Sequence, residues 1–336
     1  MSSERAVLSV LFAGVLMAAL DIAIVGPALP AIRATFDVGG RTLPWVFSGY
    51  VLFYLIGTPL LAKRSDRRGR RVVFVQSLAL FAAGSLLVAG ALNFPMLLAG
   101  RAVQAFGAGG LFPVAAAVIA DTVPLERRGR VLGLIGATFG LAFLLGPLLG
   151  GLLLHWSWRA LFLINVPVAA LLMVLARRTL PQQGRAESGA FDARGAALLS
   201  VVLAAIVLGI GQIDTEQWVA SLLSPRVWPW LLLVAVGVPL LWSIEKRAAD
   251  PVLPPALLRS RQLKLVGIIA LAAGTVEAGM VFLPDVAVRG LGVDAAAASF
   301  MMLPLVLTIA IGAPLAGQLL DRIGPRAVVQ GGLSLT

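Results

Sequence analysis

The sequence predicts an all-α membrane protein, a bundle of helices that cross the bilayer many times. Of its 336 residues, 59% are hydrophobic and 13% are charged, whereas roughly a quarter of the residues in an ordinary soluble domain are charged. Apolar runs near the ~20 residues that span a bilayer recur along the whole chain. The polar stretches between these runs are too short to form a soluble core.

Ten complete spans are predicted, and each is a long apolar run between polar turns. The first is too long for the apolar region of a signal peptide and no obvious cleavage site follows it, so we expect it to be retained. An eleventh run begins near Ala327 and is cut off at Thr336. In order, the spans are Val7–Ala28, Val46–Leu61, Val72–Ala91, Pro95–Ala120, Val131–Leu154, Ala160–Ala176, Ala196–Ile213, Val227–Ile244, Leu265–Val288 and Ala295–Leu320.

The basic residues orient these spans. With the N-terminus in the cytoplasm, 21 of the 27 Lys and Arg lie on the cytoplasmic side, five lie outside, and Arg101 lies within a span. This asymmetry is typical of the positive-inside rule. Six of the seven tryptophans then fall at the outer interface, where indole rings anchor helices. The net charge of +11 therefore indicates a multi-pass protein of the bacterial inner membrane with a cytoplasmic N-terminus, and not a nucleic-acid partner.

An internal repeat divides the chain. Asp66–Arg71 and Asp321–Arg326 share the pattern D-R-x-G-x-R at an offset of 255, and Gly57–Leu60 matches Gly312–Leu315 at the same offset. The ninth and tenth spans therefore repeat the first two. Weak internal symmetry of this kind is typical of transporters built from duplicated halves.

The repeat restarts at the ninth span and not at the seventh, which predicts three parts. Residues 1–178 form a complete six-helix half. Residues 179–262 contain a cytoplasmic loop, two inserted transmembrane helices and a further loop. Residues 263–336 begin a second half with two helices and the start of a third. By this symmetry the chain is truncated by about four spans, and we expect that the 336 residues cannot transport alone.

Asp21, Arg101 and Glu277 lie deep inside predicted spans. A carboxylate at the middle of a membrane helix costs roughly 2.5–3.5 kcal/mol, so it rarely lacks a role. If Asp21 and Arg101 face one central cavity, the carboxylate can exchange a proton as its solvation and pairing change; a static ion pair is the alternative. Glu277 is interpreted as a second proton site, an attractor of cationic substrates, or a water-facing structural acid.

The repeated cytoplasmic turn is a second candidate for function. Its arginines suit a positive-inside anchor, but Asp66 adds nothing to such an anchor. We expect Asp66 to pair with arginines or to cap a helix N-terminus, and so to hold one conformational state. The residues of the two predicted gating turns are Asp66, Arg67, Gly69 and Arg70 and, in the repeat, Asp321, Arg322 and Gly324.

Together these motifs resemble the 14-helix drug/proton antiporter branch of the major facilitator superfamily, over the whole chain. Ala62 stands where the loop motif of this family has glycine, and Ala105 replaces the glycine of its helix-4 motif. The matching segments are Leu20–Pro30, Asp66–Arg71, Arg101–Gly107, Trp158–Pro167 and the antiporter motif with Gly146, Pro147, Gly150 and Gly151.

The resemblance implies a major facilitator-type bundle, monomeric when complete, that exports small hydrophobic or cationic compounds such as drugs in exchange for protons. It supports Asp21 and Arg101 as proton-coupling residues; Glu277 is predicted as a third from its position in the ninth span. Two alternatives remain: a dedicated exporter of one metabolite, and a membrane sensor or scaffold that does not transport.

No phosphate-binding G-x-x-x-x-G-K-[ST] loop occurs, so we expect a proton gradient to supply the energy and expect no cofactor or metal. One histidine, no cysteine and scattered acids also disfavour an enzyme. The expected partners are a small-molecule substrate, protons and the lipid bilayer.

Overall fold

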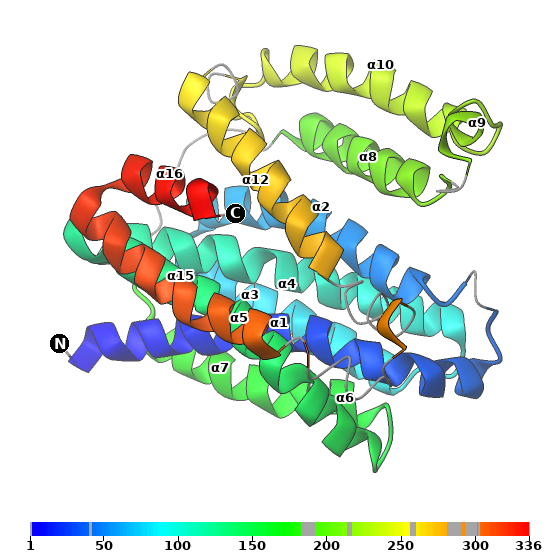
Figure 1. The fold of residues 1–336 in the computed structure, drawn as a ribbon, viewed down its shortest axis with the longest axis horizontal. Coiled ribbons are helices and arrows are strands. Elements are labelled where there is room, and N and C mark those ends of the chain that lie inside the picture. Colours follow the sequence, from blue (N-terminus) through cyan, green and yellow to red (C-terminus); the bar gives the residue numbers. More distant parts are fainter. Residues whose placement is uncertain are drawn as a thin grey trace.

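The chain forms a bundle of helices in the computed structural model, with no strand in the part that the structure describes (Figure 1). That part comprises residues 2–39, 42–182, 192–213, 217–255, 260–280, 290–292, 301 and 303–335. Seven of its helices are long and apolar enough to cross a membrane. The predicted all-α fold is confirmed.

The first six predicted spans correspond to seven helices, because the sixth span is broken. The break at Ile164 lies three residues before Pro167. Since proline has no N–H, the carbonyl of Leu163 lacks its usual helical donor. The helices are α1 (Ser2–Phe36), α2 (Trp45–Arg68), α3 (Arg70–Ala89), α4 (Phe94–Thr122), α5 (Leu125–Leu154), α6 (Ala160–Leu163) and α7 (Asn165–Thr179).

The first predicted gating turn is almost entirely helical, which corrects its interpretation as a loop. Asp66 and Arg67 belong to the last turn of α2, and Arg70 is the first residue of α3. Only Gly69 lies between the two helices, with a φ of 95° that residues other than glycine rarely adopt. The backbone therefore changes direction at one residue, Gly69.

The α4 helix lies at the centre of the first half, packed against both α2 and α3. Small residues on α4 permit this close approach. A Cβ atom at Gly107 would lie 2.6 Å from the backbone nitrogen of Phe81 in α3, and one at Gly57 of α2 would collide with the carbonyl of Phe106. Close contact between backbones of this kind is common where small residues face a neighbouring membrane helix.

The two inserted helices form a hairpin beside the first half. Figure 1 shows α8 (Ala193–Ile210) and α10 (Trp228–Glu245) side by side, with the short α9 (Trp218–Leu222) between them in the chain. Leu199 and Leu241 share a small apolar core with Leu60 of α2. The division of the chain at residues 178 and 262 stays a prediction.

The second half is described through α12 (Arg261–Met280), α15 (Leu303–Ile323) and α16 (Pro325–Leu335). The α15 helix packs along α5, where a Cβ atom at Gly317 would lie 2.7 Å from the carbonyl oxygen of Gly129. Gly324 separates α15 from α16 with a φ of 83°. It occupies the repeat position of Gly69, so both copies of the motif change direction at a glycine in the left-handed region.

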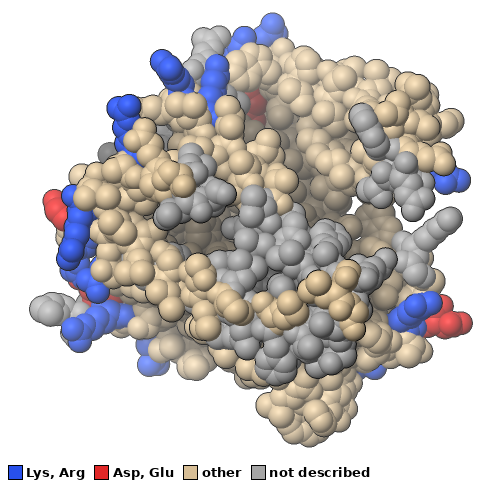
Figure 2. Space-filling model, viewed as in Figure 1, with Lys and Arg blue, Asp and Glu red and all other residues tan. Residues whose placement is uncertain are grey.

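Lysine and arginine side chains gather along one side of the molecule, the side of the N-terminus and α16 (Figure 2). The sequence places this group on the cytoplasmic side. The geometry is consistent with the uneven distribution of charge along the chain.

Candidate functional site

A buried ion pair lies inside the first half. The Nη1 atom of Arg101 in α4 donates to Oδ2 of Asp21 in α1 over 2.6 Å. The two side chains are 1% and 0% exposed. The structure thus brings together two residues that the sequence predicted for proton coupling; that role itself stays a prediction.

Three uncharged polar side chains complete the network around Asp21. Its Oδ1 atom accepts from Gln104 Nε2 over 2.7 Å and from Asn165 Nδ2 over 3.0 Å. Gln104 Nε2 also donates to Ser85 Oγ over 2.8 Å. These three residues are buried and come from α4, α7 and α3. The carboxylate is therefore held by donors from α4 and α7, which removes the cost of burying it unpaired.

Arg101 has partners that do not depend on Asp21. Its Nη1 atom also donates to Gln104 Oε1 over 2.8 Å, and its Nε atom donates to the carbonyl of Val46 over 3.4 Å. Its guanidinium carbon lies 4.0 Å from the centre of the Tyr50 ring, a favourable contact between a cation and an aromatic face. If Asp21 became neutral, the charge of Arg101 would keep these contacts.

Glycines at two helix contacts let these side chains meet. A Cβ atom at Gly84 of α3 would lie 2.5 Å from the Cα of Gln104, so the two helices approach most closely beside the network. On the other side of α1, a Cβ atom at Gly146 of α5 would lie 2.5 Å from the Cβ of Ala23. The predicted antiporter motif therefore packs on α1 two residues beyond Asp21.

A second polar cluster joins three helices at the ends that the sequence predicts to be cytoplasmic. Arg70 pairs with Asp66, and its Nε atom lies 3.2 Å from Oδ2 of Asp121 at the end of α4. Its Nη1 atom also donates to Ser65 Oγ over 2.8 Å. The predicted pairing of Asp66 with an arginine is present, and Arg70 is the residue that joins α2, α3 and α4.

We expect Asp66→Asn to slow turnover while leaving substrate affinity within about twofold, because Asp66 lies far along α2 from the buried network and its pair is partly exposed. Asp121→Asn is the matched control, since it removes the other acid on Arg70. Equilibrium binding and transport rate are measured side by side. A collapse of affinity with unchanged turnover would contradict a gating role for Asp66.

The other predicted site residues that the structure describes lie outside both the Asp21 network and the Arg70 cluster. Arg67 lies 3.7 Å from Asp250, in the loop after α10. Gly150 faces Pro27 of α1, whereas nothing lies within 4 Å of a Cβ atom at Gly151. Arg322 is exposed on α15. The side chains of Glu277, Asp321 and Pro147 lie outside the described part of the structure.

Sequence reasoning did not assign Ser85, Tyr50 or Asp121 to a site, and it included Gln104 and Asn165 only as members of motif segments. A signal existed for three of them. Ser85, Gln104 and Asn165 are polar residues in apolar helices, where unpaired polar groups are costly and partners are expected.

One family model and several curated relatives match most of the chain. A family model described as "Major Facilitator Superfamily" matches residues 11–336. Over 338 residues the chain is 38% identical to the uncharacterized MFS-type transporter YfiU of Bacillus subtilis (strain 168), covering 98% of this chain and 65% of that protein. It is 32% identical to multidrug resistance protein 3 of the same organism, covering 94% and 61%.

A triacylglyceride transporter of Mycolicibacterium hassiacum is 34% identical, with 95% of this chain and 61% of that protein covered. The chain thus spans less than two thirds of the length of these relatives. Among solved structures, the proton:xylose symporter XylE bound to a glucose analogue matches 95% of this chain and 70% of that chain, with a TM-score of 0.62 and 15% identity. At this identity the likeness concerns the fold alone.

Proposed function

The chain belongs to the major facilitator superfamily, and on that premise we propose that it exports small molecules from the cell in exchange for protons. The family is one of membrane transporters, and the chain is a multi-pass membrane protein. The proposal concerns the direction of transport, the coupling to protons and the class of substrate. It applies to the two-half transporter that the internal repeat indicates.

The buried Asp21–Arg101 pair is the observation that carries the proposal. Asp21 is an acid in a membrane helix, and its two oxygens together accept from three side chains. Protonation of Asp21 would weaken these contacts, while Arg101 would keep Gln104, Val46 and Tyr50 as partners. The pair therefore has two charge states that the surrounding helices can accommodate, as proton-driven movement between two conformations requires.

The class of substrate is supported by the names of relatives. Multidrug resistance protein 3 and the multidrug transporter protein MdtP of Bacillus subtilis are 32% and 30% identical to this chain. We propose hydrophobic or cationic compounds as the substrates. The second candidate is an apolar lipid, because triacylglyceride transporters of three mycobacteria are 34–35% identical.

The test is an efflux assay in everted membrane vesicles from cells that express the gene in full. We expect an imposed pH gradient, acid inside, to drive accumulation of a fluorescent cationic dye, and a protonophore to abolish it. A labelled triacylglyceride supplied in the membrane tests the second candidate. Dye accumulation that requires ATP and is unchanged by the protonophore would contradict proton coupling. A lack of any gradient-driven movement would contradict transport.

A further inference from the structure

The longest basic segment of the chain, residues 63–71, contains arginines that pair with an acid and arginines that do not pair with any described acid. In the described part of the structure, Lys63 and Arg67 pair with Asp250, and Arg70 pairs with Asp66 and Asp121. Arg64 and Arg68 form no ion pair with any described residue. They are four residues apart on α2 and therefore share one helix face, where like charges repel each other.

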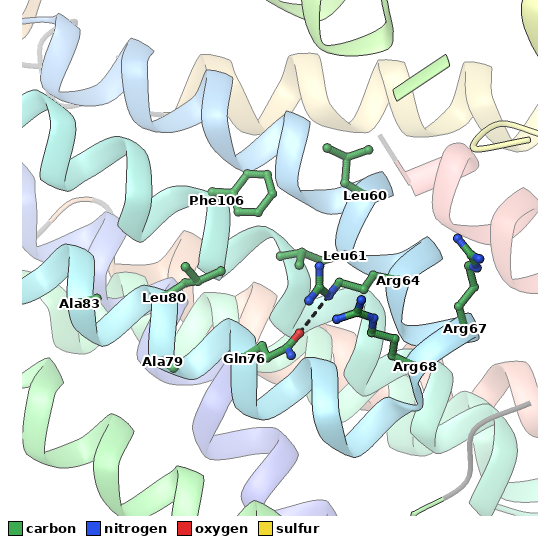
Figure 3. A pocket seen from close by; sticks show the side chains of 10 residues that line it. All are labelled: Leu60, Leu61, Arg64, Arg67, Arg68, Gln76, Ala79, Leu80, Ala83 and Phe106. Atoms are coloured by element: carbon green, nitrogen blue, oxygen red, sulfur yellow. Dashed lines mark hydrogen bonds between the residues drawn. The ribbon is translucent and has the colours of Figure 1, made fainter. Parts of the chain in front are cut away.

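These two arginines, together with Arg67, line a pocket of about 980 Å³ between α2, α3 and α4. Figure 3 shows their guanidinium groups close to each other beside Gln76 of α3, with Arg67 farther from Gln76 on the same pocket wall. Arg64 Nε donates to Gln76 Oε1 over 3.0 Å. The amide oxygen of Gln76 accepts this bond, and its amide NH2 group is a hydrogen-bond donor. This end of the pocket is therefore lined by three arginines and one amide.

The remaining wall is apolar. Leu80 and Ala83 of α3 and Phe106 of α4 line it, and Ala83 is exposed. From Gln76 to Ala83 the helix rises by roughly 10 Å, at about 1.5 Å per residue. The pocket therefore runs from the charged end of α2 to the depth where acyl chains begin.

We propose that this pocket binds one anionic phospholipid of the cytoplasmic leaflet. Arg64, Arg68 and Gln76 contact its phosphate, and one acyl chain lies along Leu80, Ala83 and Phe106. Charge complementarity selects an anion, because the two arginines lack a carboxylate partner in the described structure. The apolar wall selects a lipid over a soluble anion, because a free phosphate would leave that wall uncovered. Basic pockets between membrane helices on this side are suited to such headgroups.

Native mass spectrometry of the purified 336-residue chain tests the proposal. Dioleoyl phosphatidylglycerol is the probe, dioleoyl phosphatidylcholine the neutral comparison and inorganic phosphate the soluble anion. One phosphatidylglycerol is expected to stay bound. Arg64→Gln with Arg68→Gln is expected to weaken it about 30-fold, since each basic group near an anionic lipid contributes roughly a factor of five.

Arg177→Gln with Arg178→Gln is the matched control, because it removes two exposed charges at the end of α7, away from the pocket. It is expected to keep the lipid. Ala83→Trp, at a lipid-facing position, is expected to expel phosphatidylglycerol by filling the apolar wall. Equal retention of phosphatidylcholine, equal loss in the control, or displacement of the lipid by millimolar phosphate would each overturn the proposal.

Discussion

Asp21→Asn is expected to abolish the response of efflux to a pH gradient while the protein still inserts and folds. The asparagine side chain keeps the shape of aspartate and can still accept a hydrogen bond from Arg101. It cannot bind and release a proton. The loss of a bond to a charged group costs about 1.5–3 kcal/mol. Arg101 remains in contact with Gln104, Val46 and Tyr50, which limits that cost.

The measurement is dye efflux in everted vesicles over a range of imposed pH gradients, at matched expression. Asp37→Asn is the control, because it is the same chemical change outside the network. Asp37 has a φ of 48°, a conformation that asparagine also tolerates, so the control keeps its backbone. Full gradient-dependent efflux by the Asp21→Asn variant would show that the Asp21–Arg101 pair has a structural role and no role in proton coupling. Lower stability with unchanged pH dependence would lead to the same conclusion.

Gly84→Ala is expected to be among the most destabilising small substitutions in the first half. The new methyl group would lie 2.5 Å from the Cα and 2.6 Å from the Cβ of Gln104. Two backbones cannot yield as a flexible side chain can, so α3 and α4 must separate. Overpacking costs about 1–3 kcal/mol, and we expect the upper end of that range. The separation also draws Ser85 of α3 away from Gln104 of α4.

Thermal unfolding followed by the fluorescence of the tryptophans measures this effect in detergent. Gly26→Ala is the matched control, since nothing lies within 4 Å of a Cβ atom there and the residue is exposed on α1. Both substitutions raise helix propensity equally, by roughly 1 kcal/mol. The difference between the variants therefore isolates the contact with α4. Equal melting temperatures would show that the two helices can shift apart at little cost.

The helix boundaries illustrate how far sequence reasoning reached. Apolar runs predicted that helices lie at each of the first six spans, but α1 begins five residues before Val7 and ends eight residues after Ala28. Hydropathy measures which residues suit the bilayer, whereas a helix continues for as long as its backbone can hydrogen-bond. Polar ends such as Asp66 and Arg67 are therefore helical although they do not suit the bilayer.

The candidate site shows the same division. Asp21 and Arg101 could be found because a charge in an apolar span is costly wherever it faces. Ser85 and Asn165 could not be assigned in the same way, because a neutral polar residue can satisfy a carbonyl of its own helix. Only the contact of Asn165 with Asp21, across 144 residues of sequence, distinguishes the two cases.

By itself, the sequence determined that the chain crosses a membrane repeatedly, which loops carry the positive charge, and that two segments repeat. These properties follow from local composition and order along the chain, because the composition of each segment decides whether that segment enters the bilayer. The tertiary structure decided which side chains surround Asp21 and, within the described residues, which arginines have no acidic partner. These depend on the rotation of each helix about its axis. That rotation is set by close packing between helices, at residues such as Gly84 against α4 and Gly146 against α1.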